Sequence, residues 1–164
     1  MKNIVLIGMP GTGKSTVGVL LAKSLLMDFI DTDLIIQKKY SSSLCEIIEK
    51  FGTDGFISIE DELLSDLKTE NCVIATGGSA VYGENAMKNL KADGMVIYLD
   101  TPLSELLSRL HNIHTRGVAM KSGTTLSELY NEREPLYRKY ADITINCEGI
   151  TPEECVEKIV ASIM

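Results

Sequence analysis

The segment Gly8–Ser15 constrains this chain more than any other part of its sequence, because it reads G-x-x-x-x-G-K-[ST]. It lies between an apolar run at Asn3–Ile7 and an amphipathic helical pattern that starts at Ser15. Glycines at such a turn allow successive backbone N–H groups to point at one phosphate, and the following helix adds the positive end of its dipole. The motif predicts a nucleoside triphosphate site, with Lys14 on the β- and γ-phosphates and the Ser15 hydroxyl on Mg²⁺. The expected nucleotide-binding residues in and directly after this segment are Gly11, Thr12, Gly13, Lys14, Ser15 and Thr16.

Length and charge narrow the class of protein. With 164 residues, the chain is expected to form a single domain over residues 1–164. A formal net charge of −7 argues against a general nucleic-acid or anionic-membrane binder, which needs a basic face. The apolar runs are far shorter than the roughly 20 residues of a membrane span, and the first of them lacks a plausible signal-peptide cleavage site. We therefore expect a cytoplasmic monomer whose partners are small molecules, not nucleic acid or membrane.

Short apolar runs alternate with amphipathic helical patterns along the whole chain. This alternation is typical of an α/β fold, in which helices cover both faces of a parallel sheet and ligands bind beyond the carboxyl ends of the strands. The segments Gly8–Ser15, Asp31–Asp33 and Gly77–Ser79 each follow an apolar run directly, so we expect them to meet at one edge of the sheet. The expected strands are Asn3–Ile7, Asp28–Ile30, Cys72–Ala75, Met95–Leu99 and Asp142–Asn146.

Four short motifs predict where helices begin. Ser43-x-x-Glu46 and Thr125-x-x-Glu128 are capping boxes, in which a hydroxyl accepts a hydrogen bond from the third helical N–H group. Thr151-Pro152 and Thr101-Pro102 each predict a helix cap with a proline in the first turn. We expect Gly52 to end the helix that the first capping box opens.

A nucleoside triphosphate site alone does not define the reaction. GTPases carry base-reading motifs such as N-K-x-D, and this chain contains none. A large ATPase needs a much longer chain, so the size favours a kinase of a small acceptor. The alternatives are a nucleotide-binding regulatory protein without transfer chemistry and a kinase of a sugar acid or a nucleoside.

Several motifs, in matching order and spacing, resemble the shikimate kinase family over nearly the whole chain. They are GMPGTGKSTVG at the start, DTD at 31–33, ATGGSAV at 75–81, YLDTP followed by Arg109 and Arg116, and NEREPLY at 131–137. The resemblance implies a three-layer P-loop fold with sheet order 2-3-1-4-5, a mobile lid at about 111–124 and acceptor-binding helices at about 33–68. The implied reaction is transfer of the γ-phosphoryl group of ATP to the 3-hydroxyl of shikimate, with Mg²⁺ as cofactor, in aromatic amino-acid biosynthesis.

The resemblance also implies roles on the acceptor side. Asp31 would lie on the Mg²⁺ side, and Asp33 would orient the acceptor hydroxyl and take its proton; the alternative is that D-T-D is only a helix-capping turn. Arg133 would clamp the acceptor's carboxylate with its guanidinium fork, or else form a surface ion pair with a neighbouring acid. Gly77 and Gly78 would let the acceptor approach the backbone closely.

Two arginines of the lid region receive roles from the same resemblance. Arg116 would stabilise the charge on the transferring phosphoryl group, and Arg109 would stack on adenine. The expected catalytic residues are thus Lys14, Asp33 and Arg116, and the expected metal ligands are Ser15 and Asp31.

Three positions depart from the family's pattern. The family's F-R-x-x-E reads Phe56–Glu60 here, with Ile57 in place of the arginine that is implied to be a second clamp on the acceptor's carboxylate. Glu60, implied to hold that arginine, is then left without its partner or lies exposed. Ser79 replaces the third of three consecutive glycines, which is harmless or narrows the acceptor pocket. The lid arginine is followed by Gly117–Ala119 instead of Pro-Leu-Leu, so the lid is expected to be locally looser.

The missing arginine leaves three interpretations open. Losing one charge-assisted hydrogen bond weakens binding by about 10- to 150-fold. The chain is therefore a weak shikimate kinase that relies on Arg133, a kinase of a different and less anionic alcohol, or a degenerate paralogue.

Overall fold

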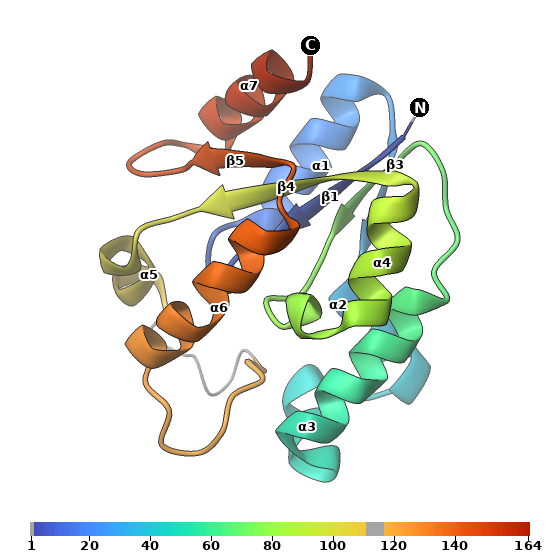
Figure 1. Cartoon of the computed structure of the whole chain (residues 1–164), viewed down its shortest axis with the longest axis vertical. Coiled ribbons are helices and arrows are strands. Elements are labelled where there is room, and N and C mark those ends of the chain that lie inside the picture. Colours follow the sequence, from blue (N-terminus) through green and yellow to red (C-terminus); the bar gives the residue numbers. More distant parts are fainter. Residues whose placement is uncertain (1, 111–116) are drawn as a thin grey trace.

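A five-stranded parallel sheet lies between two layers of helices in the computed structural model, which describes residues 2–110 and 117–164 (Figure 1). From one edge to the other, the strands are β2 (Asp28–Asp31), β3 (Cys72–Ala75), β1 (Asn3–Ile7), β4 (Gly94–Asp100) and β5 (Ile143–Asn146). The α/β fold class and the order 2-3-1-4-5 are thus confirmed. Every predicted strand is present, with ends shifted by one residue at most.

The residues of β1 alternate between two apolar cores, one on each face of the sheet. Ile4 and Leu6 pack with α1 (Lys14–Leu25) and α7 (Pro152–Ile163). Their neighbours Val5 and Ile7 belong to the opposite core. Because successive side chains of a strand point to opposite faces, a central strand with five buried residues requires helices on both sides. The second core is covered by α3 (Leu44–Ser65), α4 (Glu84–Ala92), α5 (Leu103–Arg109) and α6 (Leu126–Tyr140), with the short 3₁₀ helix η1 (Ala80–Tyr82) beside them.

Three of the four predicted helix starts are confirmed. The backbone N–H of Glu46 donates to the Ser43 hydroxyl at 3.2 Å, and Thr125 and Thr151 cap α6 and α7 in the same way. Gly52 leaves the helical conformation with φ 76° and ψ 172°, and helix resumes directly after it, so α3 is a kinked pair of helices.

The prediction for Thr101 is wrong, because its side chain does not cap α5. The helix starts at Leu103, and Pro102 occupies the cap position with extended backbone angles, φ −58° and ψ 147°. Thr101 is buried, and its hydroxyl has no hydrogen-bond partner among the described residues. A side chain that is turned into the core cannot reach the N–H groups of the following turn.

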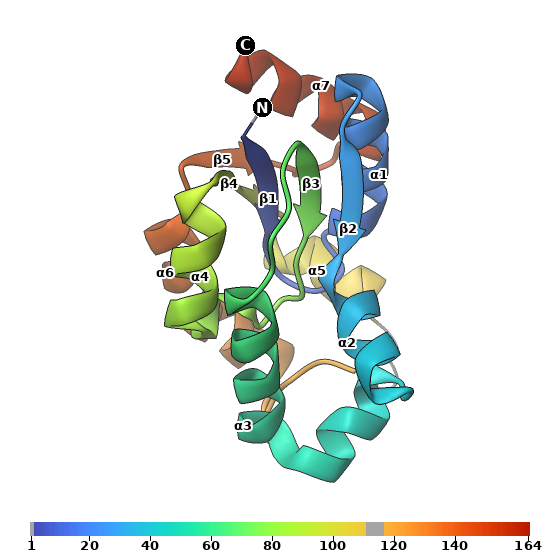
Figure 2. The same cartoon turned by 90° about the vertical axis from the view of Figure 1, so that its right-hand side faces the viewer.

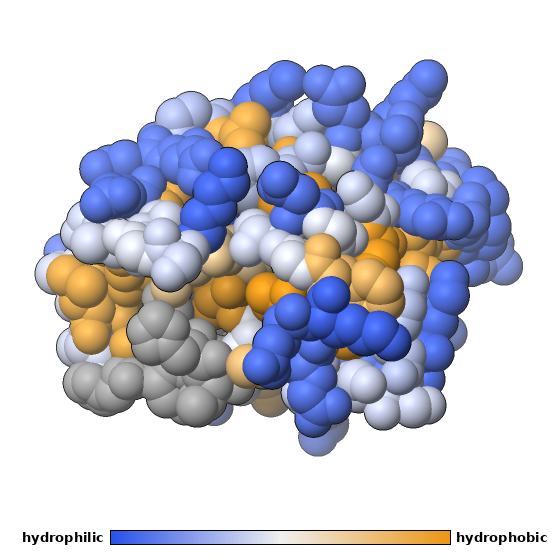
Figure 3. Space-filling view, turned by 90° about the horizontal axis from the view of Figure 1, so that it is seen from below, coloured by the Kyte–Doolittle hydropathy of each residue, from blue (hydrophilic) through white to orange (hydrophobic). Residues whose placement is uncertain are grey.

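The carboxyl ends of the strands point toward α2 (Thr32–Tyr40) and α3, which lie beyond the sheet (Figure 2). A third, smaller apolar cluster of Ile36, Ile47, Phe56 and Ala119 holds these helices together. Seen from this end, apolar side chains gather near the centre of the surface between hydrophilic ones (Figure 3). Within the described residues, no helix combines the length and apolar character that crossing a membrane requires.

Candidate active site

The loop between β1 and α1 has the conformation of a phosphate cradle. Gly11 and Gly13 both have a φ of 88°, a region that side chains disfavour, so the glycines of the motif are required by the turn itself. No side chain caps the first turn of α1 within the described residues, which leaves its N–H groups directed at the loop. The Lys14 ammonium folds back over the loop and donates to the carbonyls of Gly8 at 2.7 Å and Met9 at 2.8 Å.

Ser15 and Asp31 connect the loop to the end of β2. The Ser15 hydroxyl donates to Oδ2 of Asp31 at 2.7 Å, and Oδ1 of Asp31 accepts from the backbone N–H of Asp33 at 3.0 Å. Asp31 is therefore the N-cap of α2 and also a neighbour of the phosphate loop. The capping turn is confirmed, and the role of Asp31 at Mg²⁺ stays a prediction. A hydroxyl and a carboxylate oxygen are ligands that suit Mg²⁺.

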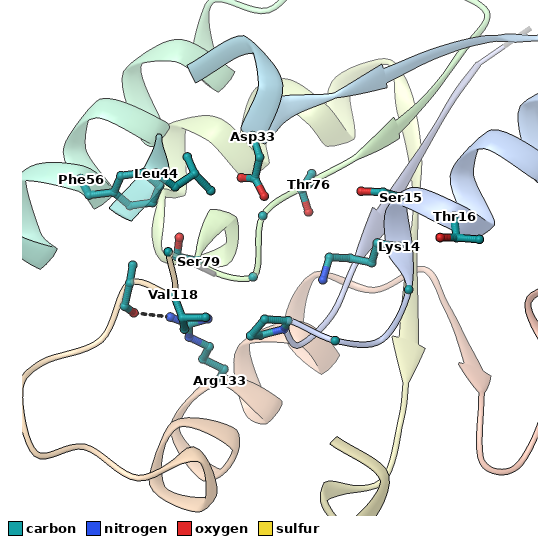
Figure 4. Close-up of a pocket in the computed structure, with 17 residues that line it drawn as sticks. Lys14, Ser15, Thr16, Asp33, Leu44, Phe56, Thr76, Ser79, Val118 and Arg133 are labelled. Atoms are coloured by element: carbon teal, nitrogen blue, oxygen red, sulfur yellow. Dashed lines mark hydrogen bonds between the residues drawn. The ribbon is translucent and has the colours of Figure 1, made fainter. Parts of the chain in front are cut away.

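Lys14, Asp33 and Arg133 line one cavity of about 200 Å³, as Figure 4 shows. They come from the N-terminus of α1, the first turn of α2 and the middle of α6. Gly77 and Gly78, which follow β3, form another part of the wall. The three segments that the sequence places after strands thus meet at one end of the sheet.

Asp33 stands in this cavity with a raised pKa. Burial, with the negative charge of Asp31 as a smaller cause, raises the pKa of Asp33 from 3.8 to about 6, against the opposing effect of Lys14. A carboxyl group with a pKa near 6 is largely ionised at neutral pH and is a better proton acceptor than an ordinary aspartate.

Arg133 is buried, with 1% of its surface exposed, so the alternative of a surface ion pair is wrong. Its Nη2 donates to the carbonyl of Ala119 at 2.5 Å, and its Nε donates to the Tyr82 hydroxyl at 3.3 Å. The guanidinium also lies over the Tyr82 ring, 5.3 Å from the centroid. A buried guanidinium at the wall of a cavity is well placed to bind an anionic ligand group.

The turn after β3 brings Asp33 close to a second carboxyl group, that of Glu60. A Cβ atom at Gly77 would lie 2.7 Å from Asp33 Oδ1 and 2.8 Å from Glu60 Oε2, so both oxygens pack against this glycine. Glu60 is 1% exposed, which excludes the expectation that it lies exposed. Its Oε1 accepts a hydrogen bond from the Ser79 hydroxyl at 2.5 Å, so its partner is a serine, whereas the resemblance implies an arginine.

Ile57 does not line the cavity that Lys14, Asp33 and Arg133 share, which we call the shared cavity. It lines a neighbouring cavity of about 510 Å³, together with Tyr82, Met120 and Glu132. Ala119 lies between the two, because it lines both. Position 57 therefore places no guanidinium at the wall of the cavity that Lys14, Asp33 and Arg133 line.

A further cavity of about 220 Å³ adjoins the phosphate loop on its other side and shares Gly13 and Thr16 with the first. Arg109 lies at its rim, where it donates to the carbonyl of Gly11 at 3.1 Å and pairs with Glu105 at 3.0 Å. This position agrees with a contact to the base of a nucleotide whose phosphates lie on the loop.

Thr151 and Pro152 also line this cavity, although their sequence motif predicts only a helix cap and no part in binding. They follow β5, and the rule that ligands bind beyond the carboxyl ends of parallel strands applies to that strand as well. Arg116 lies outside the described residues, as does the first half of the expected lid, so the role of Arg116 stays a prediction.

Comparisons with known proteins agree with this geometry. A family model described as shikimate kinase matches residues 10–164. A shikimate kinase of Thermodesulfovibrio yellowstonii is 42% identical over 163 residues, which cover 98% of this chain and 94% of the relative.

Solved structures give the same result. A structure of the shikimate kinase of Acinetobacter baumannii in complex with shikimate has a TM-score of 0.91 and 34% identity, and the match covers 99% of this chain and 93% of that one. The shikimate kinase of Aquifex aeolicus has a TM-score of 0.81 and 36% identity, with coverage of 98% and 95%. The motifs, the fold and these matches together show that the chain belongs to the shikimate kinase family.

Proposed function

We propose that this chain transfers the γ-phosphoryl group of ATP to a hydroxyl of shikimate. The observation that carries the proposal is the single cavity lined by Lys14, Asp33 and Arg133. An ammonium, a carboxyl group and a guanidinium line this one space, and they suit a phosphate, an acceptor's proton and an acceptor's carboxylate in turn. A small hydroxy acid has a hydroxyl and a carboxylate that the last two groups could bind beside a nucleoside triphosphate.

The transfer breaks the bond between the γ-phosphorus and its bridging oxygen and forms a bond from the acceptor oxygen to the same phosphorus. The N–H groups of Gly11–Ser15 and the Lys14 ammonium hold the phosphates in line with the acceptor. Asp33 takes the proton that the acceptor hydroxyl loses, and ADP leaves. Arg133 fixes the acceptor through its carboxylate.

The residues fit a magnesium ion bound together with the nucleotide. Ser15 and Asp31 would hold it. Among the described residues, no three or more His, Cys, Asp or Glu side chains gather in a group that could bind a metal ion by itself. Mg²⁺ is usually bound through one or two protein oxygens plus substrate phosphates, in agreement with this small donor set. When bound, the ion would neutralise phosphate charge.

A kinase of a less anionic alcohol is the second candidate, and Ile57 is the observation that favours it. Such an acceptor would not need two guanidinium groups. The burial of Arg133 at the cavity wall favours an acceptor that carries a carboxylate. Shikimate and its methyl ester, which lacks the negative charge, therefore separate the two candidates.

The test is an ADP-release assay against a panel of hydroxy acids that includes shikimate at high concentration. Phosphorylated shikimate, detected by mass spectrometry, supports the proposal, and the methyl ester should react much more slowly. ADP release without a phosphorylated acid would contradict it, as would equal rates with the acid and the ester.

A further inference from the structure

Ser79 and Glu60 form a buried contact at the wall of the shared cavity, where we propose that the acceptor binds. Ser79 is 5% exposed and Glu60 1%, and the hydroxyl donates to the carboxyl group at 2.5 Å. Ser79 lies in the turn after β3 and lines the cavity, whereas Glu60 lies in the second half of α3. The contact therefore joins the cavity wall to the helix behind it.

The hydrogen bond from Ser79 holds the carboxyl group of Glu60 in its position. The other carboxyl oxygen, Oε2, is buried and has no hydrogen-bond partner among the described residues. A buried carboxyl group that loses a hydrogen bond moves or draws in water, because leaving it unpaired is costly. Since Oε2 packs against Gly77 beside Oδ1 of Asp33, such a movement would reach the carboxylate that faces the acceptor.

The same turn also touches Arg133. A Cβ atom at Gly78 would lie 2.9 Å from Nη1 of Arg133. The carbonyl of Gly78 accepts a hydrogen bond from Tyr137 at 2.7 Å, which fixes this part of the turn from the side of α6. Ser79 fixes it from the side of α3. The turn thus sets the spacing between Asp33 and Arg133, the two groups proposed to bind opposite ends of the acceptor.

Position 57 offers Glu60 no donor in this chain, because isoleucine is apolar and lines the neighbouring cavity. Ser79 is the side chain that does donate to Glu60. The two unusual positions, 57 and 79, are therefore linked through one carboxyl group, although they lie in different elements.

We propose that Ser79 is a positioning residue that holds Glu60 in place of a guanidinium at position 57, so that Arg133 alone binds the acceptor's carboxylate. The proposal rests on the proposed function and specifies how its acceptor site is built. Ser79 and an arginine at position 57 are then alternative partners for Glu60, and their effects on acceptor binding depend on each other.

The test is a cycle of four proteins: the natural chain, Ser79→Ala, Ile57→Arg and the double variant. Shikimate binding is measured by calorimetry in the presence of ADP and Mg²⁺, and the KM values for shikimate and ATP by ADP release. We expect Ser79→Ala to raise the Kd of shikimate about 5- to 30-fold and to leave the KM of ATP unchanged. Ile57→Arg should improve shikimate binding at least about 5-fold more in the Ser79→Ala background than in the natural one.

Two control variants separate this coupling from general effects. Ile57→Lys adds the same charge without the planar fork, so it should rescue Ser79→Ala much less than arginine does. Ser162→Ala removes an exposed hydroxyl that bonds within α7, far from the cavity, and should change neither constant. Melting temperatures of all variants show that each of them folds.

The outcomes separate the two proposals. Equal effects of Ile57→Arg in both backgrounds would overturn the role of Ser79 and leave the proposed function standing. A parallel rise in the KM values of shikimate and ATP in Ser79→Ala would also overturn it, because the change would then be structural. If the natural chain neither binds nor phosphorylates shikimate, the proposed function itself is wrong.

Discussion

The hydroxyl of Ser15 lies 2.7 Å from Oδ2 of Asp31, so the phosphate loop and the end of β2 are joined through two oxygen atoms that both suit magnesium. The residues are 16 positions apart in the chain. They meet because the parallel strands β1 and β2 have their carboxyl ends on the same side of the sheet. The other oxygen of Asp31 caps α2, which fixes the orientation of the carboxylate. Two hydrogen bonds thus fix the Asp31 carboxylate beside the Ser15 hydroxyl.

Asp31→Asn should raise the Mg²⁺ concentration needed for half-maximal activity by about tenfold or more, because the substitution removes a negative ligand and keeps the cap of α2. The measurement is the rate of ADP release as a function of Mg²⁺ at saturating ATP and shikimate. Asp28→Asn, an exposed change at the other end of β2, is the matched control. A Mg²⁺ dependence unchanged by Asp31→Asn would exclude the carboxylate from the metal site.

Lys14→Met should lower the rate of transfer by at least about 100-fold and leave the fold intact, since it removes the ammonium that we propose to bind the phosphates. The flexible methionine keeps most of the side-chain volume in this buried position. Lys23→Met, at the exposed end of α1, serves as the control. Turnover within a factor of two of the natural chain would remove Lys14 from the mechanism.

Much of this architecture is predictable because the signals are local. The strands are short apolar runs, and three helix starts carry a hydroxyl three residues before a glutamate. The meeting of three loops at one edge follows from the rule for parallel strands. The cavity that Lys14, Asp33 and Arg133 line lies where these loops meet.

Helix α4 shows why other elements escape a local analysis. Its N-cap is Gly83, which provides no side-chain oxygen. The cap comes instead from α3, where Asp61 accepts a hydrogen bond from the backbone N–H of Ala86 at 2.7 Å. The contact between Ser79 and Glu60 is hidden for the same reason, because it joins residues 19 positions apart that no periodic pattern relates.

Arg133→Lys should raise the KM of shikimate by about 10- to 100-fold and change the KM of ATP little, because the ammonium keeps the charge but lacks the fork that grips a carboxylate. Arg138→Lys makes the same change on an exposed arginine of α6 and should be nearly silent. Equal effects of Arg133→Lys on both substrates would indicate that Arg133 supports the fold and does not bind the acceptor.

The pH dependence of transfer should show an acid limb centred near pH 6, where Asp33 loses its proton. Below its pKa, Asp33 is protonated and cannot accept the acceptor's proton, so kcat/KM for shikimate should fall about tenfold per pH unit. Asp33→Asn should abolish most of the activity and remove this limb from what remains. A flat profile from about pH 5 to about pH 8 in the natural chain would contradict the role of Asp33 as a base.

Glu60 should make the protein less stable as the pH rises through its pKa. Burial raises the pKa of Glu60 from 4.5 to about 7, and the hydrogen bond from Ser79 opposes this shift. Between these two values the folded protein retains a proton that the unfolded chain has lost, so the free energy of unfolding decreases with rising pH. In Glu60→Gln this contribution is absent. The free energy of unfolding of the variant minus that of the natural chain should therefore be about 2–3 kcal/mol larger at about pH 7.5 than at about pH 4.5.

Denaturant unfolding of both proteins at a series of pH values measures this difference. Asp33 also has a raised pKa and changes the stability of both proteins in the same direction, so its contribution largely cancels in the comparison. Glu62→Gln, on the same helix, is the control and should shift the curve little. Parallel stability curves for Glu60→Gln and the natural chain would mean that Glu60 titrates in the folded protein as it does in water, and would contradict this prediction.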